Sequence, residues 1–198
     1  GGFAGSETER DERDWQAQFT VLSGDLNGDD NSSVSSVEPS RLDNSYHVVR
    51  GADGAALDGV TISGGNATGG ATDEGHGGGV DNSVSSLLLA NCTLLANSAT
   101  FSGGGVYNGD SAALSLSNCV FEGNAAGQGG GVYCDMSSSS LTGCTFFGNN
   151  AGNGAAVYAS SSSLLLVDCA FIGNSASWSG AGVYVESSSS SLTGCTFS

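Results

Sequence analysis

The sequence contains no lysine, only four arginines and one proline, and no long apolar run. Its 20 acidic residues give a formal net charge of −16. A strongly acidic chain repels phosphate backbones and anionic lipid headgroups, so nucleic acid and anionic membrane surfaces are poor partners. No apolar stretch approaches the ~18 residues that a membrane-spanning helix needs, so we expect no membrane insertion.

The few charges are unevenly distributed. Fifteen of the acids and all four arginines lie in residues 1–81, whereas residues 82–198 hold five acids and no lysine, arginine or histidine. We therefore divide the chain into an acidic, cap-like N-terminal segment at 1–56 and regular repeats at 57–198, within one continuous solenoid domain. Because no initiator methionine or signal peptide is present, we expect a processed or partial chain. A lysine-free, acidic composition rich in serine and glycine is typical of extracellular or cell-surface proteins.

A pattern centred on cysteine recurs along the chain. Leu116, Cys119, Phe121 and Asn124 return at matching offsets, and five of the six cysteines step by 27, 25, 25 and 26 residues. A fixed period of this length indicates a stacked repeat. An earlier copy carries Val60 in the cysteine position, so the repeat begins before the first cysteine.

The repeat unit predicts an all-β fold. It lacks the 3.6-residue apolar spacing of a helix and alternates short apolar segments with glycine and serine turns. We predict a single-stranded parallel β-solenoid with ~25-residue coils of three short strands each, stacked ~4.8 Å apart. Equivalent side chains would then form internal ladders, with the asparagines at left-handed turn positions. The predicted ladders are Val60, Cys92, Cys119, Cys144, Cys169 and Cys195; Phe121, Phe146, Phe171 and Phe197; and Asn97, Asn124, Asn149 and Asn174.

Two tetrapeptides within the repeat carry a family resemblance. The pairing of Phe-x-x-Asn, as in Phe121–Asn124, with Gly-Gly-Gly-Val, as in Gly129–Val132, resembles the repeat of chlamydial polymorphic outer-membrane proteins. The first 50 residues also look like leading coils of secreted bacterial right-handed β-helix proteins. The resemblance implies a right-handed β-helix used for surface display, adhesion or structure. The sequence departs from the family pattern at Leu94, which stands where the other repeats have phenylalanine.

The cysteines fit two chemical states. Neighbouring rungs would lie within the Cα separation that a disulfide accepts. Val60 in the same position, however, indicates a place for a small apolar side chain, which a buried free cysteine also fills. We favour a reduced column and keep inter-coil bridges as the alternative. Cys134 lies outside the column, and we expect it to be the most exposed thiol.

A turn rich in side-chain oxygens is the candidate metal site. Alternating hard oxygens suit calcium, but the glycine comes too early for an EF-hand loop and no glutamate closes the coordination. We favour an acidic turn without metal, keep calcium as the alternative and expect no other cofactor. The residues concerned are Asp25, Asn27, Asp29, Asp30 and Asn31.

Polysaccharide chemistry is the main enzymatic alternative, because right-handed β-helices often belong to pectin-type lyases and hydrolases. A lyase needs a basic residue in its cleft, and residues 82–198 contain none. A hydrolase needs two carboxylates ~5–10 Å apart. Asp135 and Glu186 share one position of the repeat two coils apart, with Ser160 between them, and Asp110 lies one position off on the coil next to that of Asp135. Isolated acids on a serine-rich surface are usually only solvated, so we predict that the chain is not an enzyme.

The remaining surface features favour a structural role. Phe101 and Trp178 share one position, each within a one-residue insertion, where they either cover neighbouring loops or contact a partner or glycan. Serine runs at 137–140, 160–163 and 187–191 offer sites for glycosylation. We predict a structural or adhesive module of the cell surface or matrix that binds a surface glycan target or stacks end to end on itself into a filament. A glycan-binding module or a polysaccharide-active enzyme is the alternative.

Overall fold

The computed structural model describes residues 1–2, 8–9, 12–15, 17–70 and 73–198. Strands account for most of the regular structure of these residues, which also includes the 3-10 turns η2 (Pro39–Arg41) and η3 (Asp73–Gly75). Within these residues, no helix has the length and apolar character needed to cross a membrane.

The strands form four sheets, here named A to D, in which every pairing is parallel. Sheet A contains β1 (Val21–Ser23), β4 (Thr61–Ser63), β8 (Thr93–Leu95), β12 (Val120–Glu122), β16 (Thr145–Phe147), β20 (Ala170–Ile172) and β24 (Thr196–Phe197). Sheet B contains β2 (Val49–Arg50), β6 (Val80–Ser83), β10 (Val106–Gly109), β14 (Val132–Asp135), β18 (Val157–Ser160) and β22 (Val183–Glu186). Sheet C contains β3 (Ala55–Asp58), β7 (Ser86–Ala90), β11 (Ala113–Ser117), β15 (Ser138–Thr142), β19 (Ser163–Val167) and β23 (Ser189–Thr193). Sheet D contains β5 (Asn66–Ala67), β9 (Ser98–Ala99), β13 (Ala125–Gln128), β17 (Asn150–Asn153) and β21 (Ser175–Ser179).

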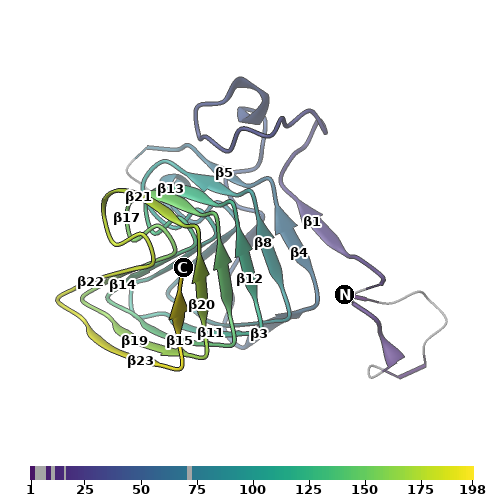
Figure 1. Cartoon of the computed structure of the whole chain (residues 1–198). Helices are drawn as coiled ribbons and strands as arrows, with labels where there is room; N and C mark the ends of the chain where they lie inside the picture. The colour runs from purple at the N-terminus through teal and green to yellow at the C-terminus, as the bar shows by residue number, and fades with distance from the viewer. Residues whose placement is uncertain (3–7, 10–11, 16, 71–72) are drawn as a thin grey trace.

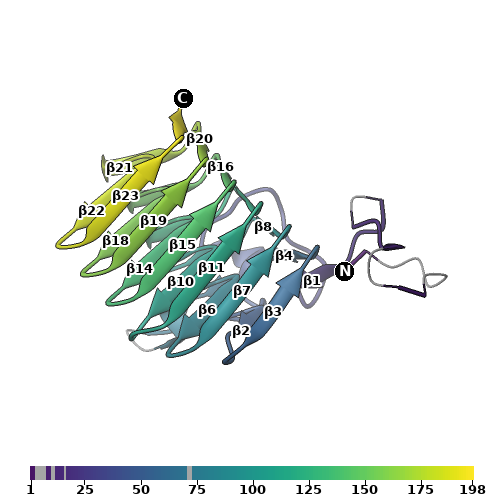
Figure 2. The ribbon, with the colours of Figure 1, turned by 90° about the horizontal axis from the view of Figure 1, so that it is seen from below.

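The chain visits the sheets in the order B, C, A and D, and then repeats the circuit (Figure 1). About five turns result, from β2–β5 to β18–β21, and β22–β24 begin a further one. Strands of successive coils lie side by side along the rod (Figure 2). The architecture is a right-handed parallel β-helix, as predicted.

Each coil has four corners, and this is why it holds four strands rather than the three expected from the sequence. In one coil the left-handed residues are Met136 (φ 45°), Gly143 (φ 64°), Gly148 (φ 62°) and Gly154 (φ 58°). Such a residue reverses the local curvature and ends a strand at each corner. The ladder asparagines were expected to take this conformation, but the residue before each of them does so instead.

The core consists of stacked identical side chains. Phe121 pairs in register with Phe146, which pairs with Phe171, and the centroids of the first two rings are 4.7 Å apart. Columns of leucine from sheet C and valine from sheet B face these rings from the other walls, and they are fully buried in the central coils. Burial of apolar surface along the whole rod, together with the sheet hydrogen bonds, stabilises the stack.

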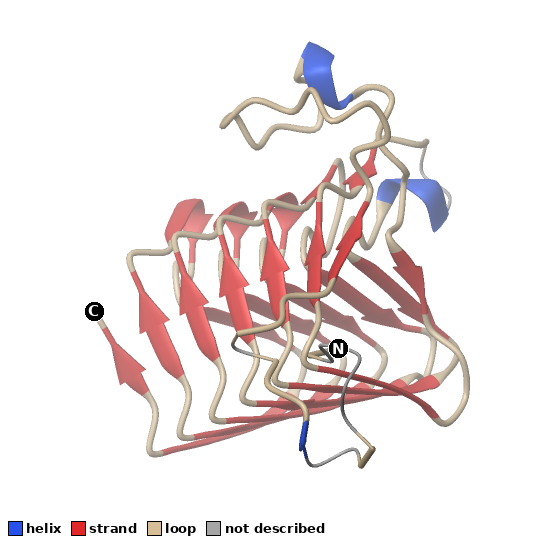
Figure 3. Ribbon diagram, turned by 90° about the vertical axis from the view of Figure 1, so that its right-hand side faces the viewer, coloured by secondary structure: helices blue, strands red, loops and turns tan. Residues whose placement is uncertain are grey.

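A buried arginine ties the segment before the repeats to the first coils. Arg41 is 1% exposed, and its guanidinium donates to Asp30 Oδ2 at 2.9 Å, to the Gly65 carbonyl at 3.2 Å and to the Ala96 carbonyl at 2.8 Å. The two carbonyls belong to corners of successive coils. The loop that carries η2 lies over the side of the rod formed by sheet D (Figure 3).

Candidate functional site

A groove on the outer surface of sheet D is a candidate binding site. Phe101 and Trp178 stand at its two ends, and Gly127 and Gly152 lie between them on the two intervening coils. Its volume is about 510 Å³, and Thr100, Ser102, Gln128 and Ser177 complete the lining. Trp178 is 77% exposed and Phe101 is 39% exposed, so the rings are open to a partner.

The sequence creates this groove by omitting side chains between the two rings. A Cβ atom at Gly152 would lie 2.9 Å from the six-membered ring of Trp178 and 2.7 Å from the Gly127 carbonyl. The floor is therefore bare backbone, and the indole rests directly against it. Aromatic faces beside hydroxyl and amide groups bind flat, neutral, hydroxylated or aromatic ligands by stacking and hydrogen bonding.

The cysteine column lies inside the rod, just before the strands of sheet A. The Val120 N–H donates to the Cys92 carbonyl and the Thr145 N–H to the Cys119 carbonyl, both at 2.9 Å, so successive cysteines occupy the same position of successive coils. Thr93 N–H bonds the Val60 carbonyl in the same way. Every cysteine is a free thiol, and all except the half-buried Cys195 are buried.

Cys134 was expected to be exposed, but it is fully buried. It points inward from β14, where its Sγ lies 3.1 Å from Ser139 Oγ. Asn108 Nδ2 donates to the same hydroxyl at 3.0 Å. The corner between sheets B and C thus has a polar interior, which the sequence pattern did not reveal because this row changes residue type from coil to coil.

The asparagine column is fully hydrogen-bonded. Asn124 Nδ2 donates to Asn149 Oδ1 at 3.0 Å, and Asn149 Nδ2 donates to Asn174 Oδ1 at 2.9 Å. Asn97 begins the column, and its Oδ1 accepts the Gly65 N–H at 3.0 Å. The phenylalanine column continues beside it to Phe197, whose ring centroid lies 4.6 Å from that of Phe171.

The acidic turn brings two of its five predicted residues, Asp25 and Asp29, into one carboxylate cluster, whereas Asp30 and Asn31 have other partners. Asp30 accepts from Arg41 and Asn44, which uses its Oδ2 in a structural ion pair. Asn31 donates to Glu38. Oxygens of Asp25 and Asp29 instead approach a carboxylate that the sequence did not suggest. These two and Asp43 have ligand atoms within 4.8 Å of one another.

A row of tyrosines crosses the outer face of sheet B, and sequence inspection missed it. Tyr107, Tyr133, Tyr158 and Tyr184 pair in register, with neighbouring ring centroids 4.9 to 5.7 Å apart. The sequence signal for this row was available, because each of these tyrosines directly follows the buried valine of its sheet B strand. The carboxylates considered for hydrolysis lie along this row.

Burial raises the pKa values of tyrosines in this row and of the nearby Asp135. It raises the pKa of Tyr133 to about 12, with the charges of Asp135 and Glu186 acting in the same direction. It also raises the pKa of Asp135, as does Asp110, whereas His76 lowers it. Tyr158 donates its hydroxyl to Glu186 Oε2 at 2.6 Å.

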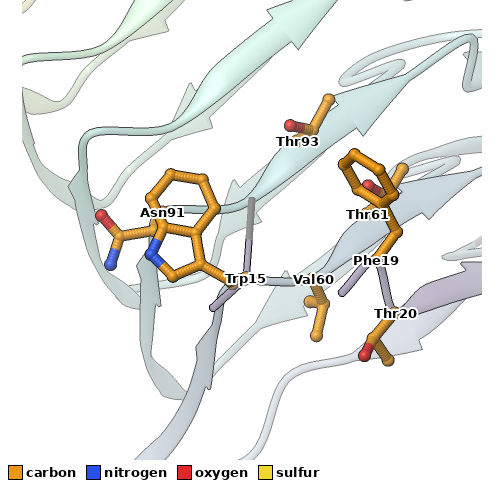
Figure 4. Close-up of a pocket in the computed structure, with 8 residues that line it drawn as sticks. Trp15, Phe19, Thr20, Val60, Thr61, Asn91 and Thr93 are labelled. Atoms are coloured by element: carbon orange, nitrogen blue, oxygen red, sulfur yellow. The ribbon is translucent and has the colours of Figure 1, made fainter. Parts of the chain in front are cut away.

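Part of the N-terminal segment covers the first strands of sheet A. Trp15 and Phe19 line a cavity of about 160 Å³ with Val60, Thr61 and Asn91 (Figure 4). The indole lies beside Asn91 and the phenyl ring beside Thr61. Residues of this acidic segment therefore lie against the N-terminal strands of sheet A.

The comparisons with known proteins agree with the fold. A family model described as "right handed beta helix region" matches residues 27–198. Searches of curated proteins and of solved structures found no match. Because the family model covers most of the chain, and four in-register parallel sheets are present, the chain belongs to the right-handed β-helix family.

Proposed function

We propose that this chain is an extracellular structural and adhesive module, a rigid β-solenoid that displays binding features on a cell surface or in a matrix. The unbroken register of its internal ladders is the observation that supports this most. Phe121, Phe146 and Phe171 stack with nearly parallel rings, 11° and 5° between successive planes. Such a scaffold holds surface groups at fixed intervals of one rung, ~4.8 Å.

The outer surface suits contact with neutral, hydroxylated partners. Residues 82–198 carry five acids and no basic side chain. Exposed serines such as Ser138, Ser161 and Ser163 lie at strand ends and corners of sheet C. We propose that these runs carry glycans or hydrogen-bond to glycans, since a serine hydroxyl both donates and accepts.

Labelling of intact cells tests the surface location. An antibody against the folded module should label producing cells without permeabilisation, and beads coated with the module should adhere to target surfaces or matrix. Labelling that appears only after permeabilisation would contradict the proposal.

Self-stacking is the structural form of the same proposal. Most coils present the same ladder residues to their neighbours, so a coil of one copy resembles the natural neighbour of a coil in another. Negative-stain microscopy of the purified chain should show filaments with a repeat near the rod length. Short rods of uniform length at high concentration would count against stacking.

A glycan-binding module is the second candidate, favoured by the aromatic groove on sheet D. Trp178→Ala should weaken binding of a neutral oligosaccharide about tenfold, which corresponds to 1.4 kcal/mol. Phe147→Ala is the matched control because Phe147 is an exposed aromatic residue (48%) on another sheet, and it should leave the affinity unchanged. Equal effects of both substitutions would exclude the groove.

The enzymatic alternative is tested on the same material. If the chain cleaves an acidic glycan such as polygalacturonate and Asp135→Asn abolishes the activity, the module is polysaccharide-active. Intact glycan after prolonged incubation is the outcome that we expect.

A further inference from the structure

The five thiols of the cysteine column lie one above another in the core of the rod. They belong to Cys92, Cys119, Cys144, Cys169 and Cys195, which occupy one position in five successive coils. The backbone pairing places neighbouring members one rung apart, a separation of ~4.8 Å. The column is enclosed by apolar side chains, and Cys119 and Cys144 are fully buried.

The thiols donate to backbone carbonyls. Cys119 Sγ donates to the Leu89 carbonyl at 3.4 Å, and Cys169 Sγ donates to the Leu141 carbonyl at 3.5 Å. Both carbonyls belong to the preceding coil, so these thiols are directed along the column towards the neighbouring rung.

The spacing of the column matches the geometry of a soft metal ion. Thiolates select soft ions such as Cu(I), and a monovalent ion of this class binds two sulfurs in a line. With a metal–sulfur bond of ~2.3 Å, two sulfurs on opposite sides of one ion lie ~4.6 Å apart, close to the ~4.8 Å rung.

We propose that the cysteine column binds soft monovalent ions such as Cu(I), each held between the thiolates of two successive rungs. Two thiols release two protons to solvent, two metal–sulfur bonds form, and the bis-thiolate complex carries one negative charge. No electron is transferred. Because each sulfur serves one ion, five thiols hold at most two ions. The inference is independent of the proposed surface function.

The number of bound ions tests the proposal, because it depends on which cysteine is removed. The folded chain, or chain refolded with the ion to allow entry, is loaded anaerobically with Cu(I) supplied as its acetonitrile complex and then desalted. Two ions per chain are expected, each with two sulfur neighbours by X-ray absorption. Cys119→Val isolates Cys92 and should leave one ion. Cys144→Val preserves the pairs Cys92–Cys119 and Cys169–Cys195 and should leave two.

The column itself supplies the folding control, since Val60 occupies the same position in an earlier coil. Valine variants should therefore keep the circular dichroism spectrum of the parent chain. Cys134→Ala is the matched control outside the column, and Ala159 is its register partner on the next coil. It should retain two ions. The proposal is overturned if the parent chain retains none, if Cys119→Val and Cys144→Val lose ions equally, or if Cys134→Ala alone lowers the count.

Discussion

Asn149 Oδ1 accepts two hydrogen bonds from Asn124, one from its side-chain amide and one from its backbone N–H, each 3.0 Å long. The same amide of Asn124 also donates to the Leu94 carbonyl at 2.9 Å. Each asparagine therefore satisfies buried polar groups of the coil before it, and the stability of one coil depends on the next.

Replacement of Asn124 by alanine should strongly destabilise the rod. The change leaves the Leu94 carbonyl and the donors of Asn97 without their partners, at ~1–3 kcal/mol for each buried group. We expect the free energy of unfolding in urea to fall by ~3 kcal/mol or more. Asn150 is exposed and follows the ladder residue Asn149. Asn150→Ala should change the free energy of unfolding by less than ~0.5 kcal/mol. Similar losses in both variants would contradict a structural role specific to the ladder.

Arg41→Met should cost about 3–5 kcal/mol of unfolding free energy, because it leaves the Asp30 carboxylate without its buried partner. It also frees the carbonyls of Gly65 and Ala96. The double variant with Asp30→Asn should recover part of the loss, since the uncompensated charge is then removed. If chemical denaturation shows the double variant to be as unstable as the single one, the ion pair is not the cause.

The thiols should differ sharply in accessibility. In the denatured, unreduced chain all six should react with a maleimide reagent, because all are free. In the native chain Cys195, the half-buried member, should react first, whereas Cys134 should stay protected. Mass spectrometry after brief labelling locates the modified residue. Fewer than six reactive thiols after denaturation would indicate inter-coil bridges.

The Asp135 carboxyl should make the stability depend on pH. Its pKa is raised above the ordinary 3.8 by burial and by Asp110. The folded chain therefore holds this proton more tightly than the unfolded chain, and the contribution to stability is lost as pH rises through the raised pKa. Asp135→Asn should have a higher Tm than the parent chain at neutral pH. The difference in Tm should shrink on acidification towards the ordinary carboxyl pKa. A difference that grows on acidification would contradict a raised pKa of Asp135 in the folded chain.

Gly152→Ala should displace the indole of Trp178, because the added methyl group would lie 2.9 Å from its ring. In a Trp15→Phe background, Trp178 is the remaining tryptophan, and its emission should shift. Gly70→Ala has open space around the new Cβ atom and should leave the emission unchanged. An unshifted spectrum for Gly152→Ala would mean that the ring does not rest on the groove floor.

The repeat period predicted the ladders because identical residues one coil apart must face the same environment. It did not predict the four corners, since residues as different as Gly143, Met136 and Val84 take the left-handed conformation there. Cys134 shows the same limit, because its row has no constant residue. Arg41 could not be predicted either, because its position depends on how a unique segment folds back on the coils. Phe101 and Trp178 were recognisable in the sequence, but the open groove between them was not, because it depends on how the rings lie over Gly127 and Gly152.

The in-register stacking has a consequence for how the chain can change its length. Removal of residues 120–144 joins Cys119 directly to Thr145, and the register then aligns each remaining rung with one of the same type. Duplication of the same 25 residues works equally well. The gene can therefore lengthen or shorten the rod by whole coils without inventing a new interface, and rod length becomes a trait that recombination alone can set.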